Sequence, residues 1–205
     1  MLHKEILSPE QVALLPAVKN FSKQFGLVGG TAIALHIGHR KSIDFDLFSY
    51  QGFDNNRIKE ELIKQIRVFQ PFVNKLGEYT LTTRDGVKMT FYRFPYELEY
   101  VDNFEKIIKL PDLLTLAAMK AFAIGQRSKW KDYVDLYFIM KDFYSIEQIN
   151  ERGREVFGGE YNEKMFKVQL SYFKDLDYTE KVDFLPGFEV GEKKIKKALV
   201  EFSLM

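Results

Sequence analysis

The chain has 205 residues, of which 46% are hydrophobic and 15% aromatic, so it can bury a sizeable core and is not intrinsically disordered. Thirty basic and 29 acidic residues leave a net charge of +1, which excludes a strongly electropositive nucleic-acid binder of the histone type. The absence of cysteine excludes disulfide scaffolds, cysteine-ligated zinc, iron–sulfur clusters and thiol nucleophiles.

The first residues lack the uninterrupted apolar segment of a secretory signal. No window of the sequence approaches the roughly 20 apolar residues of a membrane span. We therefore expect a soluble, cytoplasmic protein.

The first half of the chain predicts alternating helices and strands. Ser8-Pro9-Glu10-Gln11 has the cap and first-turn residues of a helix, which we expect to run to about Phe25. A short buried strand, Leu27-Val28, then leads through two glycines into a helix over residues 31–37. The elements expected next are a strand over 43–48, a helix over 54–67, and strands over 68–84 and 87–94 joined by a type I′ turn at Asp85-Gly86.

The second half predicts helices only. They are expected over residues 111–124, 129–141, 146–157, 162–174 and 191–203. The sequence thus predicts an α+β protein with a mixed core over residues 1–105 and a helical region over residues 106–205.

Two aspartates on the strand over residues 43–48 are the first chemical signal. Side chains alternate along a strand, so Asp44 and Asp46 share one face while Ile43, Phe45 and Leu47 point to the core. Neighbouring carboxylates repel each other unless a cation neutralises them, and Mg²⁺ prefers oxygen ligands and substrate phosphates. The pair is therefore a candidate Mg²⁺ site. The alternative is that the two aspartates only form the solvent-exposed face of an amphipathic edge strand.

A glycine pair before a helix is the second signal. Glycines let the backbone approach a phosphate closely, and the N–H groups at a helix start attract anions. Such a pair is common by itself; its combination with two aspartates in this order is rarer, and it favours metal-assisted phosphoryl or nucleotidyl transfer. The candidate phosphate-binding residues are Gly29, Gly30, Thr31, Arg40 and Ser42.

A third group of charged residues lies downstream. Asp132 and Asp135 are three residues apart and share one helical face, from which either can pair with Lys120. Such a carboxylate can hold the ammonium toward a triphosphate or act as a base on an incoming hydroxyl. The alternative is a salt bridge that ties two helices together.

These motifs resemble those of the AbiEii/AbiGii toxin family of nucleotidyltransferases. The first is Gly29-Gly30-Thr31-Ala32 followed by His39-Arg40-x-Ser42-Ile43-Asp44-Phe45-Asp46-Leu47-Phe48. The second is Lys120-Ala121, Arg127 and Lys131-Asp132-Tyr133-Val134-Asp135-Leu136-Tyr137. The resemblance implies a minimal nucleotidyltransferase fold, a small mixed sheet with flanking helices, followed by a helical carboxyl-terminal half.

The resemblance also implies a function and roles for residues. The protein would be the toxin of a type IV toxin–antitoxin or phage-defence pair, using a nucleoside triphosphate and Mg²⁺ to modify tRNA or protein, with a cognate antitoxin as partner. Asp44 and Asp46 would bind the metal, Lys120 would contact the nucleotide, and Asp132 would be the catalytic partner.

One position departs from the expected pattern. Nucleotidyltransferases of this fold commonly carry a third carboxylate on the strand beside the aspartate pair, where the best match here has Thr90. Threonine is a poor Mg²⁺ ligand, and Glu97 and Glu99 lie beyond Pro95. Three hypotheses remain: an active nucleotidyltransferase, a kinase-like or protein-modifying enzyme of the same fold, and a catalytically silent module that binds nucleotide or a partner protein.

Overall fold

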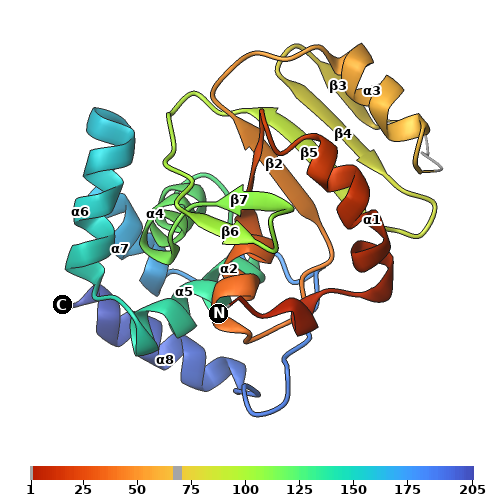
Figure 1. The fold of residues 1–205 in the computed structure, drawn as a ribbon. Coiled ribbons are helices and arrows are strands. Elements are labelled where there is room, and N and C mark those ends of the chain that lie inside the picture. The colour runs from red at the N-terminus through yellow and green to blue at the C-terminus, as the bar shows by residue number, and fades with distance from the viewer. Residues whose placement is uncertain (1, 67–70) are drawn as a thin grey trace. The chain divides into compact units, whose positions relative to one another are not determined.

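The computed structural model describes residues 2–66 and 71–205 (Figure 1). The chain divides into two compact units, Met1–Asp112 and Leu113–Met205. The strands lie in the first unit and the second is helical, so the predicted α+β class is confirmed.

The first unit contains a short 3-10 helix (Lys4–Ile6), α1 (Pro9–Asn20), β1 (Gly26–Val28), α2 (Gly29–Ile37), β2 (Phe45–Ser49), α3 (Asn55–Ile63), β3 (Val73–Lys75), β4 (Glu78–Thr82), β5 (Lys88–Arg93), β6 (Asp102–Phe104) and β7 (Ile108–Leu110). Five of these strands form one sheet in the order β1-β2-β5-β4-β3. Strands β2 and β5 run parallel and the other neighbouring pairs are antiparallel, so the sheet is mixed.

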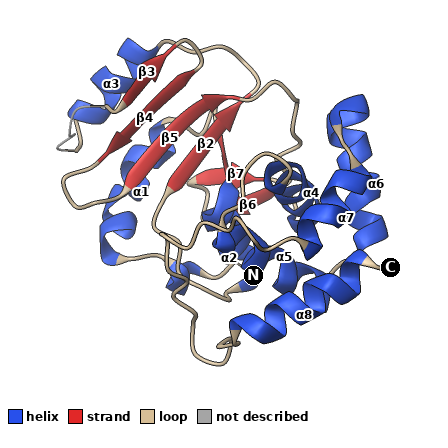
Figure 2. Cartoon of the chain, turned by 180° about the vertical axis from the view of Figure 1, so that it is seen from behind, coloured by secondary structure: helices blue, strands red, loops and turns tan. Residues whose placement is uncertain are grey.

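Helices α1 and α3 lie on the same side of this sheet in both views (Figures 1 and 2). The sheet buries Phe45, Leu47 and Phe91 almost completely. The rings of Phe21 and Phe25, which follow α1, lie 4.8 and 5.3 Å from the Phe91 ring. These aromatic contacts anchor the turn after α1 on the apolar face of the sheet.

The start of α1 is confirmed and its expected end is wrong. The Ser8 hydroxyl accepts a hydrogen bond from the Gln11 backbone N–H at 3.2 Å, and the Gln11 side chain accepts one from the Ser8 N–H at 3.1 Å. The helix ends at Asn20 instead of continuing to Phe25. It ends early because the chain turns there to bring Phe25 into the core and enter β1.

The expected strand over residues 43–48 is confirmed as β2 with one correction. Ile43 was expected to face the core, but its side chain is 56% exposed. The ladder begins only at Phe45, so the alternation of the strand does not extend back to residue 43. From Phe45 onward the buried and half-buried residues alternate as predicted.

The remaining strand predictions are confirmed in part. Asp54 caps α3 by accepting a hydrogen bond from the Asn56 N–H at 2.9 Å. The helix ends at Ile63 and residues 64–66 form a turn and a bend, so the expected length of this helix is wrong. Its expected last residue, 67, and residues 68–70 of the next expected strand lie outside the described residues. The expectation of a single strand there is wrong, because the chain turns at residues 76–77 and forms two antiparallel strands, β3 and β4.

The turn at Asp85-Gly86 is present but is not of type I′. That type needs positive φ at both central residues, and only Gly86 has it, at 84°. The Gly86 N–H instead bonds to the Thr83 carbonyl at 3.0 Å, and the Thr83 N–H bonds to the Val87 carbonyl at 2.8 Å. These bonds describe a three-residue loop that ends in a left-handed glycine.

The second unit contains α4 (Leu113–Ile124), α5 (Trp130–Asp142), α6 (Ile146–Phe157), a 3-10 turn (Gly158–Glu160), α7 (Glu163–Ser171) and α8 (Glu192–Ser203). All five helices expected in this half are confirmed. Their core includes Tyr133, Ile149, Phe166, Leu170 and Leu199. Among the described residues, no helix has the length and apolar character needed to cross a membrane.

Candidate functional site

The glycine pair lies where the sequence predicts it, at the junction of β1 and α2. Gly29 is the first residue of α2 and has a φ of +72°, a conformation that favours glycine. A Cβ atom on Gly29 would collide with the Asp46 carboxylate, and one on Gly30 would lie 2.6 Å from Nη2 of Arg40. The junction thus needs glycine because a carboxylate and a guanidinium approach its backbone closely.

The start of α2 has backbone N–H groups without a side-chain cap. Val28 stands at the cap position and cannot accept a hydrogen bond through its side chain. The first N–H groups of a helix have no partner within the helix, and they carry partial positive charge. This end of α2 has the properties of an anion site, with the buried Arg40 guanidinium beside it.

Asp44 and Asp46 lie on one face of the sheet, as predicted. Asp46 is on β2 and half-buried, and Asp44 immediately precedes the strand with a side chain 16% exposed. The Thr31 hydroxyl donates to the backbone carbonyl of Asp44 and lies 3.0 Å from the Ser42 hydroxyl oxygen. Thr31 and Ser42 therefore hold the residues before β2 against the first turn of α2.

The proposed phosphate ligands differ in how their polar groups are engaged. The Thr31 hydroxyl is bonded within the protein, and the residue is 1% exposed. The Arg40 guanidinium donates through Nη1 to the Lys41 carbonyl at 2.9 Å and presents Nη2 to Gly30. Arg40 and the backbone at Gly29 and Gly30 are thus the groups gathered at the helix start, and the phosphate role of Thr31 stays a prediction.

The strand beside the aspartates carries no acid at the expected place. The parallel register of β2 and β5 pairs Asp46 with Thr90. Two residues earlier on β5, the Nζ of Lys88 lies 3.3 Å from Oδ2 of Asp44. Glu97 and Glu99 are exposed beyond the strand. The sequence reasoning missed Lys88, although its spacing of two from Thr90 already placed both side chains on one face.

The aspartate pair supplies two of the oxygen ligands that Mg²⁺ prefers. Within residues 2–66 and 71–205, no group of three or more His, Cys, Asp or Glu residues has the geometry of a metal site. Mg²⁺, however, is usually held by one or two carboxylates together with substrate phosphates. Because Gly29 has no side chain, the Asp46 carboxylate lies directly against the backbone at the start of α2, where phosphate oxygens would bind. The residues therefore fit an ion shared with a triphosphate.

The downstream charged group is a buried ion-pair network in the second unit. The Lys120 ammonium, on α4, donates to Asp132 and lies 3.3 Å from Oδ2 of Asp135, both on α5. Nε of Arg127 donates to the other oxygen of Asp132 at 3.0 Å. Lys120 is 4% exposed and both aspartates are fully buried. The predicted pairing is present, and it joins α4 to α5 as the structural alternative requires.

Asp132 is ionised in this network. Burial acts to raise the pKa of its carboxyl, but the charges of Lys120 and Arg127 outweigh burial and hold the pKa below its usual value. An ionised Asp132 is able to accept a proton or orient a cation. The catalytic roles of Lys120 and Asp132 stay predictions, because neither side chain is open to solvent.

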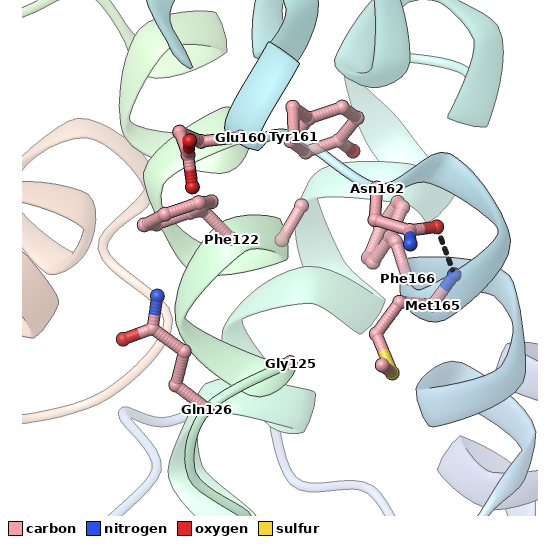
Figure 3. Close-up of a pocket in the computed structure, with 9 residues that line it drawn as sticks. Phe122, Gly125, Gln126, Glu160, Tyr161, Asn162, Met165 and Phe166 are labelled. Carbon is pink, nitrogen blue, oxygen red and sulfur yellow. Dashed lines mark hydrogen bonds between the residues drawn. The ribbon is translucent and has the colours of Figure 1, made fainter. Parts of the chain in front are cut away.

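A separate hollow lies between α4 and α7 of the second unit (Figure 3). Phe122 of α4 and Gln126, in the turn after α4, line it opposite Met165 and Phe166 of α7, and the carboxylate of Glu160 is its one ionised group. No residue expected at the nucleotide site lines this hollow. Its apolar walls and negative charge do not suit a triphosphate.

Comparisons with known proteins agree with the fold. The uncharacterized protein aq_aa25 of Aquifex aeolicus (strain VF5) is 31% identical over 191 residues, covering 87% of each chain. The structure resembles MenT4, a nucleotidyltransferase toxin of Mycobacterium tuberculosis H37Rv, with a TM-score of 0.60, 13% identity, and 94% and 80% of the two chains covered. It also resembles JHP933 of Helicobacter pylori, with a TM-score of 0.59, 17% identity, and 100% and 92% covered.

The family comparison covers the first of the two predicted sites. Residues 14–107 match the family described as the nucleotidyl transferase AbiEii toxin of type IV toxin–antitoxin systems. This range contains the glycine junction, the aspartate pair and β5. The chain belongs to the AbiEii family of nucleotidyltransferase toxins.

Proposed function

We propose that the protein is an active Mg²⁺-dependent nucleotidyltransferase that moves a nucleoside monophosphate from a nucleoside triphosphate to a hydroxyl of RNA, with tRNA as the first candidate, or of protein. It would act in the cytoplasm as the toxin of a toxin–antitoxin or phage-defence pair, with a cognate antitoxin as its partner. The observation that carries the proposal is the approach of the Asp46 carboxylate to the bare backbone at Gly29.

The reaction joins the acceptor oxygen to the α-phosphorus of the triphosphate. The bond between the α-phosphorus and the oxygen that bridges to the β-phosphate breaks, and pyrophosphate leaves. The acceptor hydroxyl gives up its proton to a nearby carboxylate or to water. When bound, Mg²⁺ supplies positive charge that neutralises the phosphates and lowers the pKa of a coordinated hydroxyl.

Residues of the first unit would bind the metal and the phosphates. Asp44 and Asp46 would hold Mg²⁺, since both carboxylates lie on the polar face of the sheet. The backbone N–H groups at Gly29 and Gly30 would hold phosphate oxygens, and the Arg40 guanidinium would add charge beside them. Positioned charges of this kind stabilise the negative charge that develops on the leaving pyrophosphate.

The test uses purified protein, Mg²⁺, each α-labelled nucleoside triphosphate, and either total tRNA or a cell lysate. The Asp44→Ala/Asp46→Ala variant is run beside the wild type, with Glu97→Gln as a control that removes an exposed acid outside the site. We expect label on a macromolecule with the wild type and the control only. Label on RNA would identify RNA as the acceptor. Label on protein would instead identify a protein-modifying enzyme of the same fold.

A catalytically silent nucleotide- or partner-binding module is the second candidate. It is favoured by Thr90 in place of the third acid and by the Lys88 ammonium on Asp44. Nucleotide binding by the wild type without label transfer to any acceptor would favour this module over the enzyme.

A further inference from the structure

We propose that Lys88 is a positioning residue that stands in for the third acidic ligand, so that the site binds one divalent ion and not two. This inference rests on the proposed function, because it concerns the metal that the aspartate pair would hold. It assigns to Lys88 two effects: it holds Asp44 in place before the ion binds, and it supplies the positive charge that a second ion would supply.

Strand register places Lys88 in the site. Strands β2 and β5 are parallel, and Asp46 pairs with Thr90. Residues two apart on a strand share a face, so Lys88 and Thr90 are the β5 side chains beside the aspartates. The 3.3 Å separation between Lys88 Nζ and Asp44 Oδ2 confirms that the two side chains meet. An ammonium therefore lies on the same face of β5 as Thr90, two residues from the position of the missing carboxylate.

Partial burial strengthens this ion pair. Lys88 is 34% exposed and Asp44 is 16% exposed, so water screens their charges less than it screens a fully exposed pair. The pair also bridges the parallel strands on the polar face. The ammonium therefore competes directly with any metal ion for the Asp44 carboxylate.

The charge balance of the cluster favours one ion. Asp44 and Asp46 are balanced by Lys88 and by Arg40, which lies beside Gly30, so the cluster carries no net charge. One divalent ion gives the cluster a net positive charge that attracts a triphosphate. A second ion would have to bind beside an ammonium, with threonine in place of a carboxylate ligand. Beside the position of the missing acid, the protein therefore supplies the Lys88 ammonium as a cation of its own.

Mn²⁺ binding to the full-length protein tests this inference without turnover. Electron paramagnetic resonance counts bound Mn²⁺, a carboxylate-binding ion that reports on Mg²⁺ sites, with and without a non-hydrolysable α,β-methylene triphosphate. We expect one Mn²⁺ per chain in the wild type. Lys88→Met is expected to bind Mn²⁺ about five- to tenfold more tightly without nucleotide, because the competing charge is gone.

Two further variants sharpen the test. Lys88→Glu places an acid beside Asp44 and Asp46, and we expect it to raise the number of bound Mn²⁺ ions per chain from one to two. If Lys88→Glu does not fold, Thr90→Asp introduces an acid on the same face of β5, opposite Asp46. Lys75→Met removes a lysine ion-paired with Glu78 at 3.0 Å elsewhere in the sheet, and it should leave Mn²⁺ binding unchanged. Circular dichroism melting confirms the fold of each variant.

The outcomes separate the role of Lys88 from the proposed function. Two Mn²⁺ per wild-type chain, or equal affinity in the wild type and Lys88→Met, would overturn the role of Lys88 and leave the metal site standing. A loss of stability in Lys88→Met with unchanged Mn²⁺ binding would show that the ion pair is only structural. No Mn²⁺ binding by any protein, even with the nucleotide analogue, would overturn both.

Discussion

The Asp46 carboxylate lies directly against Gly29, so closely that a Cβ on this glycine would come 3.1 Å from Cγ of Asp46 and closer still to its Oδ2. The contact joins the two motifs that are 17 residues apart in the sequence. It brings the strand that carries the acids to the helix start that would bind phosphate.

Replacing Gly29 should therefore damage both the fold and the site. Gly29→Ala forces a side chain into a positive-φ position and against Asp46, and we expect a loss of at least about 1 kcal/mol in the free energy of unfolding, with loss of nucleotidyl transfer. Urea denaturation and label transfer measure the two effects. Gly52→Ala is the control, because a Cβ there meets no atom within 4 Å. Equal stability and activity of Gly29→Ala and the wild type would contradict the geometry.

Replacing Lys120 should destabilise the helical unit. Lys120→Met leaves the buried carboxylates of Asp132 and Asp135 without their shared ammonium, and we expect a loss of about 3–5 kcal/mol. Urea denaturation at pH 7 measures it. Lys193→Met on the exposed side of α8 is the control, with an expected change below about 0.5 kcal/mol.

The catalytic prediction for Lys120 has its own readout. Lys120→Arg keeps the positive charge in the network, so it should retain much of the stability that Lys120→Met loses. If Lys120 contacts the nucleotide, this variant folds but transfers label more slowly and with a raised KM for the triphosphate. Unchanged kinetics in a folded Lys120→Arg would leave the residue with a structural role alone.

Glu180 makes part of the stability depend on pH. Burial alone would raise the pKa of its carboxyl, but hydrogen bonds and charges from Lys129 and Lys131 lower it to about 2, from an ordinary 4.5. A carboxyl whose pKa is lowered by folding stabilises the folded protein. This stabilisation is complete at pH values above the ordinary pKa, and it is lost as the pH falls toward the pKa of the folded state. Because the side chain is 37% exposed, solvent screening limits the contribution to about 1 kcal/mol.

Glu180→Gln tests this pH dependence. The variant should be about 1 kcal/mol less stable than the wild type at pH 6, and the difference should shrink between pH 4.5 and about 2. Urea denaturation across this range measures it. Glu97→Gln, an exposed acid, should show no such difference. If the difference in the free energy of unfolding between Glu180→Gln and the wild type grew toward low pH, the lowered pKa of Glu180 would be contradicted.

Local signals explain what the sequence could predict. The capping residues Ser8 and Gln11 act on each other across one turn, so the start of α1 follows from four residues. The alternation of β2 from Phe45 to Ser49 likewise follows from neighbouring side chains. The glycine pair and the aspartates could be joined into one site because their motifs recur together in a family.

Long-range contacts explain the rest. The early end of α1 depends on Phe25 packing against Phe91, a residue of β5 that is distant in the sequence. The hairpin of β6 and β7 was not predicted, because its turn at Glu105 and Lys106 places two non-glycine residues at positive φ. Lys88 was overlooked because only the register of β5 against β2 shows that it faces Asp44.

The rate of label transfer by Asp46→Asn shows directly whether the Asp46 carboxylate takes part in the reaction. This change keeps the shape of the side chain beneath Gly29 and removes only its charge, so the fold should persist while transfer falls at least about 100-fold. Thermal melting of the same sample verifies folding, and Glu97→Gln serves as the matched loss of one acid. A folded Asp46→Asn that transfers label at the wild-type rate would show that this carboxylate does not hold the metal, and it would contradict the proposed nucleotidyltransferase site.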